Sequence, residues 1–418
     1  MKNSLGKMLF LALAVAAVVV IAREPVFWKR YFLAVTGNSG PSSSLYQPRE
    51  RIVGGNQPTA PRVNPQLESL DPRGLEAAAS YAGERDSSAL IVSRHEHIVF
   101  EKYWHGTGFD TLEDGQSFAR VVAALAVGAA LAERKIHWPD EPIGYFIPAW
   151  HDDPRGAITV SQLLKMSSGL RAPEPSLNPW SASVRGSLGP DVLTAALAEP
   201  LAAKPGSVWL EQSADPQLVA AVIERATGMR YAQFVSQALW RPIGASDAWL
   251  WLDHPGGTAH ADCCMFAQQG DWIRLAELLV KDGNYRGEEV IHPGWIARMV
   301  VPAAGNAAYG SYVRLGKVSP ATERLARESP AGMGLTGDPT GTEPYAVDDL
   351  FVVEGSGGNR IWAVPSMHLA ILRMGRLPRH ASDWDETRVP NLIIRAARDY
   401  QPPQVRPGSD ISKIVPGH

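Results

Sequence analysis

SFARVVAALAVGAALAERK, residues 117–135, is rich in Ala and Val and has hardly any polar face. This pattern predicts a helix over residues 118–135 that is buried on all sides, because a helix at the protein surface keeps a polar stripe. A helix buried in this way must be covered by other elements of the same domain. We therefore interpret the rest of the chain as the layers around it.

The flanking residues predict an antiparallel sheet and further helices. A helix over residues 75–82 is followed by residues 89–92, which can pair with residues 98–100 as a hairpin. Periodic apolar residues then predict helices over residues 158–166, 191–197, 216–227 and 272–281. After about residue 308 the apolar period changes from 3.6 to 2, which predicts strands over residues 309–315, 350–353, 360–364 and 368–373 and a last helix over residues 385–400. The order predicts an α+β fold whose antiparallel sheet is completed by both ends of the chain and flanked by helices, with a large helical insertion.

The composition indicates a globular protein and excludes some classes of function. Of the 418 residues, 45% are hydrophobic and 20% are charged. Lys and Arg number 40 and Asp and Glu 43, so the formal charge of −3 gives no field to hold a nucleic acid. The only cysteines are Cys263 and Cys264, which excludes a disulfide framework and a four-cysteine zinc site.

The amino terminus predicts a membrane anchor. Lys2 and Lys7 precede an apolar run over residues 8–22, as in a secretory signal, and no small-residue cleavage site follows the run. The run is shorter than the about 20 residues that span a bilayer, so a cleaved signal peptide is the alternative to an uncleaved anchor. The next residues combine aromatic and cationic side chains, a pattern typical of the lipid headgroup zone: Phe27, Trp28, Lys29, Arg30, Tyr31 and Phe32.

We divide the chain into four parts on this basis. Residues 1–36 are the signal anchor and interfacial segment, and residues 37–70, rich in Gly, Ser and Pro, are a tether. Residues 71–401 are the folded domain, and residues 402–418 are a flexible tail. The expected location is the bacterial inner membrane, with the domain on the periplasmic side. The sequence leaves the oligomeric state open.

Ser117 stands at the entrance of the buried helix. Free N–H groups and the helix dipole stabilise negative charge there, which suits a nucleophilic hydroxyl. Ser is also a preferred N-cap residue, so a purely structural role is the alternative.

A resemblance favours the nucleophilic role. Order and spacing over residues 70–400 resemble the serine β-lactamase and penicillin-binding-protein-like family, with class C β-lactamase-related esterases and 6-aminohexanoate-dimer hydrolases as the nearest type. The stretches that carry it are SFAR (117–120), DDPRGAITVSQLLKMSSGL (152–170), KPGSVWLEQSAD (204–215), ATGMRYAQFVSQALWRPIGA (226–245), DWIRLAELLVKDGNYRGEEVIHPGWI (271–296) and EGSGGNRIWAVPSMHLAILRMG (354–375). The resemblance implies a β-lactamase/transpeptidase-like fold and acyl transfer to Ser117.

The catalytic motifs depart from the family pattern. The Ser-x-x-Lys motif has Arg120 in place of Lys, and a guanidinium cannot serve as a base. The Tyr-x-Asn motif becomes Glu211-Gln212-Ser213, where the Glu211 carboxylate is a chemically reasonable general base. The third motif, Lys-Thr-Gly in relatives, corresponds to residues 355–358, which keep the glycines and lack the cation.

Two functions follow from these motifs. The first is a membrane-anchored serine hydrolase of an ester or amide, with Ser117 as nucleophile, Glu211 as base, Arg120 as electrostatic partner and backbone N–H groups of Ser117 and residues 356–359 as the oxyanion hole. The second is an inactive relative that binds a peptide, glycan or lipid fragment. A hydrogen bond from Ser117 to Glu211 would favour the hydrolase, and an ion pair that holds Glu211 on Arg120 would favour binding.

The remaining expected site residues contact the substrate. They are Trp209, Ser213, Ser356, Gly357 and Gly358. The run His260-Ala261-Asp262-Cys263-Cys264 is not a recognised zinc pattern, so we expect no metal site and two packed thiols, with a disulfide between neighbours as the alternative. We expect no cofactor and a small-molecule or peptide-like substrate.

Overall fold

The computed structural model describes residues 15, 18–37, 44–316, 341–378, 380 and 383–402. Its main sheet is antiparallel and has the strand order β3-β2-β12-β11-β10-β9. The strands are β2 (Ser87–Arg94), β3 (His97–Tyr103), β9 (Arg314–Leu315), β10 (Phe351–Glu354), β11 (Arg360–Val364) and β12 (Leu369–Gly375). Because β2 pairs with β12, both ends of the domain complete one sheet, as predicted.

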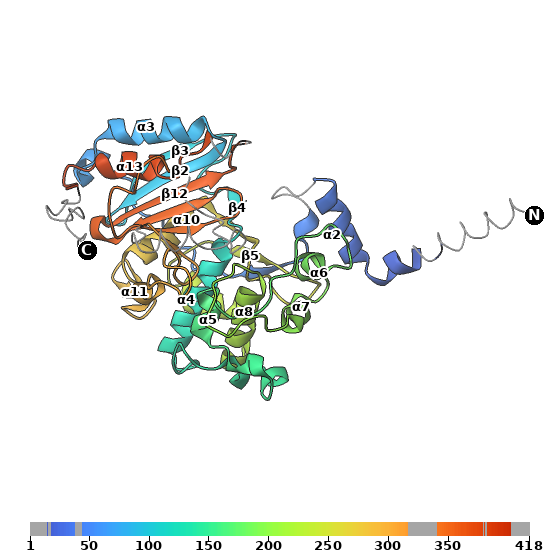
Figure 1. Ribbon diagram of the computed structural model, residues 1–418. Helices are drawn as coiled ribbons and strands as arrows, with labels where there is room; N and C mark the ends of the chain where they lie inside the picture. Colours follow the sequence, from blue (N-terminus) through green and yellow to red (C-terminus); the bar gives the residue numbers. More distant parts are fainter. Residues whose placement is uncertain are drawn as a thin grey trace, which may run out of the picture.

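Both faces of this sheet are covered by helices. Leu90 and Val92 belong to the core formed with α3 (Pro72–Gly83) and α13 (Arg388–Arg395). Ile91, between them on β2, belongs to the larger core on the other face, because successive strand residues point to opposite faces. Figure 1 shows α3 and α13 on one side of the sheet and α10 with the helical insertion on the other.

The helix α4 (Phe118–Ala132) lies at the centre of the larger core, and every residue from 121 to 130 is buried. This confirms the predicted burial. The helix ends three residues before the predicted limit of 135, because Arg134 has a left-handed φ of 56° that a helix cannot continue through. It packs against α8 (Ala214–Thr227), which ends at Gly228 with φ 70°, as predicted.

The other helices are short, apart from α10. They are α5 (Val160–Leu164), α6 (Ala182–Leu188), α7 (Val192–Ala198), α9 (Tyr231–Val235), α10 (Gln269–Val280) and α11 (Trp295–Met299). Single helical turns of 3-10 type are η1 (Ser44–Tyr46), η2 (Pro65–Glu68), η3 (Ile143–Tyr145), η4 (Pro148–Trp150), η5 (Pro154–Ala157) and η7 (Pro365–Met367), and η6 (Ser236–Trp240) is a π-helix. A two-stranded ribbon pairs β7 (Asn284–Tyr285) with β8 (Glu288–Glu289).

A second sheet was not predicted. Its order is β1-β5-β6-β4, formed by β1 (Arg49–Ile52), β5 (Ala248–Trp251), β6 (Met265–Gln268) and β4 (Leu112–Asp114). Ile52 is fully buried in it, and Leu70 is fully buried against α13 at the other end of the proposed tether. The expectation of an unstructured tether is therefore wrong for residues 44–70, because distant partners supply the pairing and burial that the local sequence lacks.

Two predicted elements near the carboxyl end are shorter than expected. Of residues 309–315 only Arg314–Leu315 form a strand, because Tyr312 has a left-handed φ of 58° that interrupts extended backbone. The last helix covers Arg388–Arg395 and not residues 385–400. Its start is delayed because the Asp385 carboxylate accepts the N–H of Thr387, as at a turn.

The helix α2 (Pro25–Val35) packs against the protein. Phe27 is fully buried and Trp28 is 7% exposed, and both belong to one buried cluster with Val184 of α6. The Arg30 guanidinium donates to the main-chain carbonyls of Leu252 at 2.5 Å and Asp253 at 2.6 Å. Figure 1 shows α2 beside α6. The prediction that Phe27, Trp28 and Arg30 face lipid headgroups is therefore wrong, because the protein itself buries them.

Residues 1–14, 16 and 17 of the proposed anchor segment lie outside the described residues, as do residues 403–418 of the proposed tail. Within the described ranges, no helix combines the length and the apolar character required to cross a bilayer.

Candidate active site

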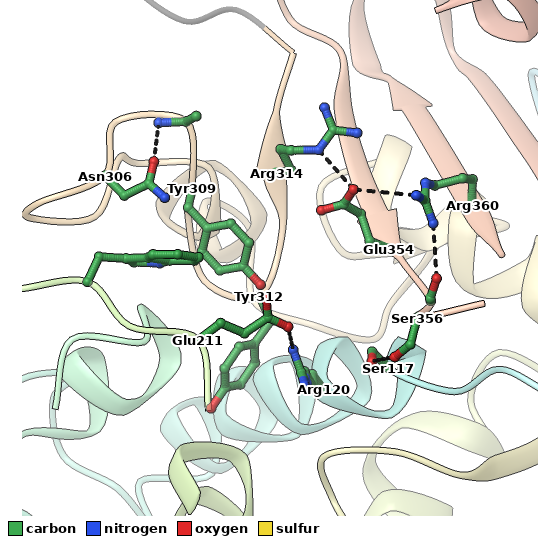
Figure 2. Close-up of a pocket in the computed structure, with 13 residues that line it drawn as sticks. Ser117, Arg120, Glu211, Asn306, Tyr309, Tyr312, Arg314, Glu354, Ser356 and Arg360 are labelled. Atoms are coloured by element: carbon green, nitrogen blue, oxygen red, sulfur yellow. Dashed lines mark hydrogen bonds and ion pairs between the residues drawn. The ribbon is translucent and has the colours of Figure 1, made fainter. Parts of the chain in front are cut away.

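Ser117 precedes α4 and faces a cavity of about 230 Å³ between that helix and the β10–β11 connection. Its side chain makes no capping hydrogen bond to the helix. Its hydroxyl lies 2.7 Å from the hydroxyl of Ser356, and either oxygen can be the donor. Figure 2 shows the two side chains pointing toward each other. The structural N-cap role therefore does not explain this serine.

Arg120 lies one turn into α4, on the face of Ser117. Its Nη1 donates to Glu211 Oε1 at 2.5 Å, and its Nε donates to the main-chain carbonyl of Asp262 at 3.2 Å. Burial alone would lower the pKa of Arg120, but Glu211, followed by Tyr309 and Asp262, raises it above the ordinary value. Arg120 is therefore a permanent cation that holds the Glu211 carboxylate.

Glu211 does not bond the Ser117 hydroxyl. Its Oε1 accepts from Arg120, and its Oε2 accepts no hydrogen bond from the described part of the chain. The side chain is 39% exposed. The Glu211 carboxylate thus keeps one oxygen without a donor at the cavity. Its ion pair with Arg120 is the arrangement that we expected for a protein that binds a ligand without turnover.

The glycine-containing motif forms the turn between β10 and β11. Gly355 N–H donates to the Asn359 carbonyl at 2.8 Å, which closes the turn. The N–H of Gly357 donates to the Gln116 side chain, and that of Gly358 donates to the Gly355 carbonyl. Within the described ranges, the N–H groups of Ser117 and Ser356 have no acceptor, so these two remain available to an oxyanion.

An ionic network closes the cavity beyond Ser356. Arg314 Nε donates to Glu354 at 2.9 Å, and Arg360 Nε donates to the buried Glu386 at 2.5 Å. Burial alone would raise the pKa of Glu386, but Arg360 and Arg314 hold it below the ordinary value. The two cations are thus balanced by two carboxylates, as Figure 2 shows for Glu354.

Aromatic rings form the opposite wall. Trp209 and Tyr309 meet edge to face with centroids 5.0 Å apart, and Tyr312 lies beside them. Burial raises the pKa of Tyr309 and of Tyr312 far above the ordinary value, so both phenols stay protonated.

The structure brings together Ser117, Arg120, Trp209, Glu211 and Ser356 of the predicted site residues. It does not bring Gly357 and Gly358 into the lining of this cavity, and Ser213 lines a neighbouring cavity.

Sequence reasoning missed the aromatic and ionic walls: Asn306, Tyr309, Tyr312, Arg314, Glu354 and Arg360. Glu354 directly precedes the third motif, and this position indicates a residue near the site. The alternating apolar residues over 309–315 predict only a strand. Nothing in this stretch indicates that Tyr309 and Tyr312 line a site.

The two cysteines form a disulfide, so the expectation of two thiols is wrong. His260, Asp262 and Cys263 place potential ligand atoms within 4.8 Å of one another. The Cys263 sulfur is not a thiolate in this state, which removes the strongest ligand of the group.

Comparison with known proteins agrees with this geometry. The family model described as Beta-lactamase matches residues 73–374. The 6-aminohexanoate-dimer hydrolase of Paenarthrobacter ureafaciens is 24% identical over 236 residues, which cover 54% of this chain and 59% of that protein. A putative D-alanyl-D-alanine carboxypeptidase of Escherichia coli is 24% identical over 184 residues, 37% of this chain and 41% of that protein. The matches thus span about half of these curated relatives.

Solved structures share the fold at low identity. A putative 6-aminohexanoate-dimer hydrolase from Bacillus anthracis has a TM-score of 0.62 at 17% identity and covers 84% of this chain and 90% of its own. A family VIII carboxylesterase has a TM-score of 0.57 at 16% identity and covers 83% of this chain and 100% of its own. With its α+β fold and the matched residues 73–374, the chain belongs to the beta-lactamase family of serine hydrolases.

Proposed function

We propose that the protein hydrolyses a small ester or amide through an acyl-enzyme on Ser117. One observation carries the proposal: the Ser117 hydroxyl leaves its own helix uncapped and faces the cavity, next to Arg120 and two free backbone N–H groups. A serine that served only the helix would bond the first-turn N–H groups.

The proposed reaction has two steps. Ser117 Oγ attacks the substrate carbonyl while its proton passes to Glu211, and the oxyanion is bound by the N–H groups of Ser117 and Ser356. The leaving alcohol or amine takes the proton from Glu211. Water then attacks the acyl-enzyme, gives a proton to Glu211 and releases the acid, and that proton returns to Ser117.

The position of Glu211 supports a role as base after substrate binds. Its Oε2 is free of described donors, and its side chain is 39% exposed, so the carboxylate can turn toward Ser117 while Arg120 still holds Oε1. Catalytic hydrogen bonds often tighten only in the substrate complex.

The charge balance supports a substrate without a carboxylate. Arg314 and Arg360 lie at the cavity, but Glu354 and Glu386 engage both. An incoming carboxylate would have to displace one of these partners. We therefore expect esters or amides to be turned over and nitrocefin, a carboxylate-bearing β-lactam, to react far below β-lactamase rates. Relatives named as a family VIII carboxylesterase and as a 6-aminohexanoate-dimer hydrolase support the same range.

The proposal includes presentation of the domain outside the cytoplasm of a bacterium, with residues 8–22 as a membrane anchor. The lysines before this apolar run support it. The Cys263–Cys264 disulfide supports it as well, since disulfides persist in oxidising compartments. Fractionation of the full chain tests it: recovery in the soluble cytoplasmic fraction would contradict this part.

Labelling tests the nucleophile. The wild-type protein should react with a fluorophosphonate probe and hydrolyse 4-nitrophenyl esters, and Ser117→Ala should lose both. Ser207→Ala, which alters an exposed serine that does not line the cavity, is the matched control. Equal labelling of wild type and Ser117→Ala would contradict the proposal.

Binding without turnover is the second candidate function, and the Arg120–Glu211 ion pair favours it, because the pair holds the predicted base away from the Ser117 hydroxyl. The two candidates differ in one result. A broad ester and amide panel with no Ser117-dependent turnover, together with saturable binding of a panel member, would select the second.

A further inference from the structure

Exposed apolar side chains gather at one end of the molecule, where α2 lies beside α6 and well apart from α13 (Figure 1). Four large apolar residues of α2 and of the loop before α6 are 46–78% exposed: Phe32, Val35, Leu177 and Trp180. We call these four residues the α2 patch. Contiguous exposed apolar surface marks a contact with a protein or a membrane, whereas single exposed residues do not.

Ring contacts and one hydrogen bond join the two halves of the α2 patch. The Trp28 ring centroid lies 5.7 Å from that of Trp180 and 6.1 Å from that of Phe32. The Tyr31 hydroxyl donates to the Leu177 carbonyl at 2.7 Å. The α2 patch is therefore one surface, and not a set of scattered side chains.

The α2 patch follows directly on the proposed membrane anchor. The apolar run ends at Ala22, and α2 begins at Pro25. Residues 18–21 at the end of the run are apolar and 40–65% exposed. Trp28 Nε1 donates to the Val20 carbonyl at 3.2 Å, so the end of the run contacts α2. The exposed apolar surface thus continues from the anchor onto the domain.

The α2 helix is fixed to the domain. Phe27 is fully buried, Arg30 donates to the Asp253 carbonyl at 2.6 Å, and Arg185 of α6 pairs with Glu24 at 2.6 Å. A helix rises 1.5 Å per residue, so an anchor inserted in a bilayer would hold all of α2 within about 20 Å of the point where the chain leaves the hydrocarbon. The α2 patch would therefore stay close to the headgroups.

The residue types of the α2 patch suit the surface of a bilayer. Trp and Phe are amphipathic or apolar rings of the kind that settle at membrane–water interfaces. Arg23 and Lys29 are exposed cations on either side of the start of α2, and they can approach lipid phosphates. The exposed Glu174 in the loop before α6 opposes them, so the apolar side chains supply most of the attraction.

We propose that the α2 patch docks on the surface of the lipid bilayer that the anchor enters, with Phe32, Leu177 and Trp180 at the level of the headgroups. The contact rests on the membrane location in the proposed function. It adds a fixed orientation of the domain on the membrane, which the anchor alone does not supply.

Spin labelling tests the contact on the full chain in vesicles of phosphatidylethanolamine and phosphatidylglycerol. A nitroxide is attached to Leu177→Cys, and the native cysteines do not compete because they form a disulfide. In vesicles we expect the label to gain collisions with oxygen, which concentrates in lipid, and to lose collisions with a water-soluble nickel chelate. Leu67→Cys on η2 is the matched control, since Leu67 and Leu177 are both 78% exposed, and its label should stay accessible to nickel.

A charge placed in the α2 patch should break the contact. Phe32→Asp replaces a ring that is 51% exposed and keeps the buried Phe27 and Arg30, so the melting temperature should be retained. We expect the Leu177 label to become accessible to nickel again in this variant. Tyr145→Asp, which alters an exposed ring outside the patch, should leave the label protected. A Leu177 label that is equally accessible to nickel in solution and in vesicles would overturn the proposal.

A second copy of the chain is the competing occupant of the α2 patch. Broadening of the Leu177 label spectrum that disappears on dilution with unlabelled protein would show that another copy covers the patch, and would overturn the membrane contact.

Flotation of the same vesicles separates the α2 patch from the proposed function. Protein that floats while the Leu177 label stays accessible to nickel would keep the anchor and reject the patch. Protein that does not float would reject both. Hydrolysis of 4-nitrophenyl acetate without dependence on Ser117 would reject the hydrolase and leave a protected Leu177 label as support for the patch.

Discussion

Arg120 Nη1 donates to Glu211 Oε1 at 2.5 Å, so the two residues that replace the family's lysine and tyrosine bond each other. Arg120 keeps the positive charge of the family's lysine, and Glu211 introduces a carboxylate that pairs with it. Together they form a neutral pair that holds the carboxylate at the edge of the active site. The predictions below test what this pair and its surroundings do.

Glu211→Gln should reduce kcat by at least about a hundredfold with little change in KM, because a general base contributes about 10² to 10⁴ in rate. The amide keeps the size and can still accept a hydrogen bond from Arg120. Steady-state kinetics on a 4-nitrophenyl ester measures both constants. A variant with normal kcat would remove Glu211 from the mechanism.

Ser356→Ala should lower kcat by about tenfold and change the free energy of unfolding by about 1 kcal/mol or less, because it removes a single hydroxyl partner of Ser117. Kinetics and chemical denaturation together check this. Ser207→Ala serves again as the exposed control. A loss of stability that fully accounts for the lost activity would show that Ser356 acts only in folding.

Asp215→Asn should stabilise the protein increasingly as the pH rises. Asp215 is fully buried, its Oδ2 has no partner, and burial raises its pKa from 3.8 to about 8. The folded state therefore binds a proton that the unfolded state has released, so this contribution to stability is complete below pH 3.8 and is lost as the pH rises through about 8.

Urea denaturation of both proteins at pH 5, 7 and 9 measures the effect. The difference in unfolding free energy should favour the variant by about 4 kcal/mol more at pH 9 than at pH 5, because each of the about three pH units between 5 and 8 contributes about 1.4 kcal/mol. Other buried carboxyls with raised pKa, such as Asp114 and Glu277, are common to both proteins and cancel in the comparison. A difference that does not vary with pH would contradict the assignment.

Arg30→Met should release α2 from the domain. The Arg30 side chain is 1% exposed and donates to three main-chain carbonyls, of Gln47, Leu252 and Asp253, which Met would leave without a donor. We expect a loss of about 2–4 kcal/mol of docking free energy and faster hydrogen exchange over residues 25–35. Lys29→Met alters the exposed neighbour and should leave exchange unchanged.

Much of the fold followed from local pattern. The absence of a polar face predicted that α4 is buried, and the period-2 residues at both ends of the domain predicted one antiparallel sheet. The four-stranded sheet could not be predicted in the same way. Its strand β1 is charged and short, and it becomes a strand only through pairing with β5, about two hundred residues later.

For the candidate site, the sequence by itself determined that Ser117 and Arg120 share one face of a helix, because helical spacing alone decides that relation. Only the tertiary structure decided that Arg120 forms an ion pair with Glu211 and that the Ser117 hydroxyl is hydrogen-bonded to Ser356. It also decided that tyrosines and arginines line the cavity. Ser117 and Ser356 are 239 positions apart, and Arg120 and Glu211 are 91 apart. Contacts over such separations depend on how whole elements pack, which no local periodicity encodes.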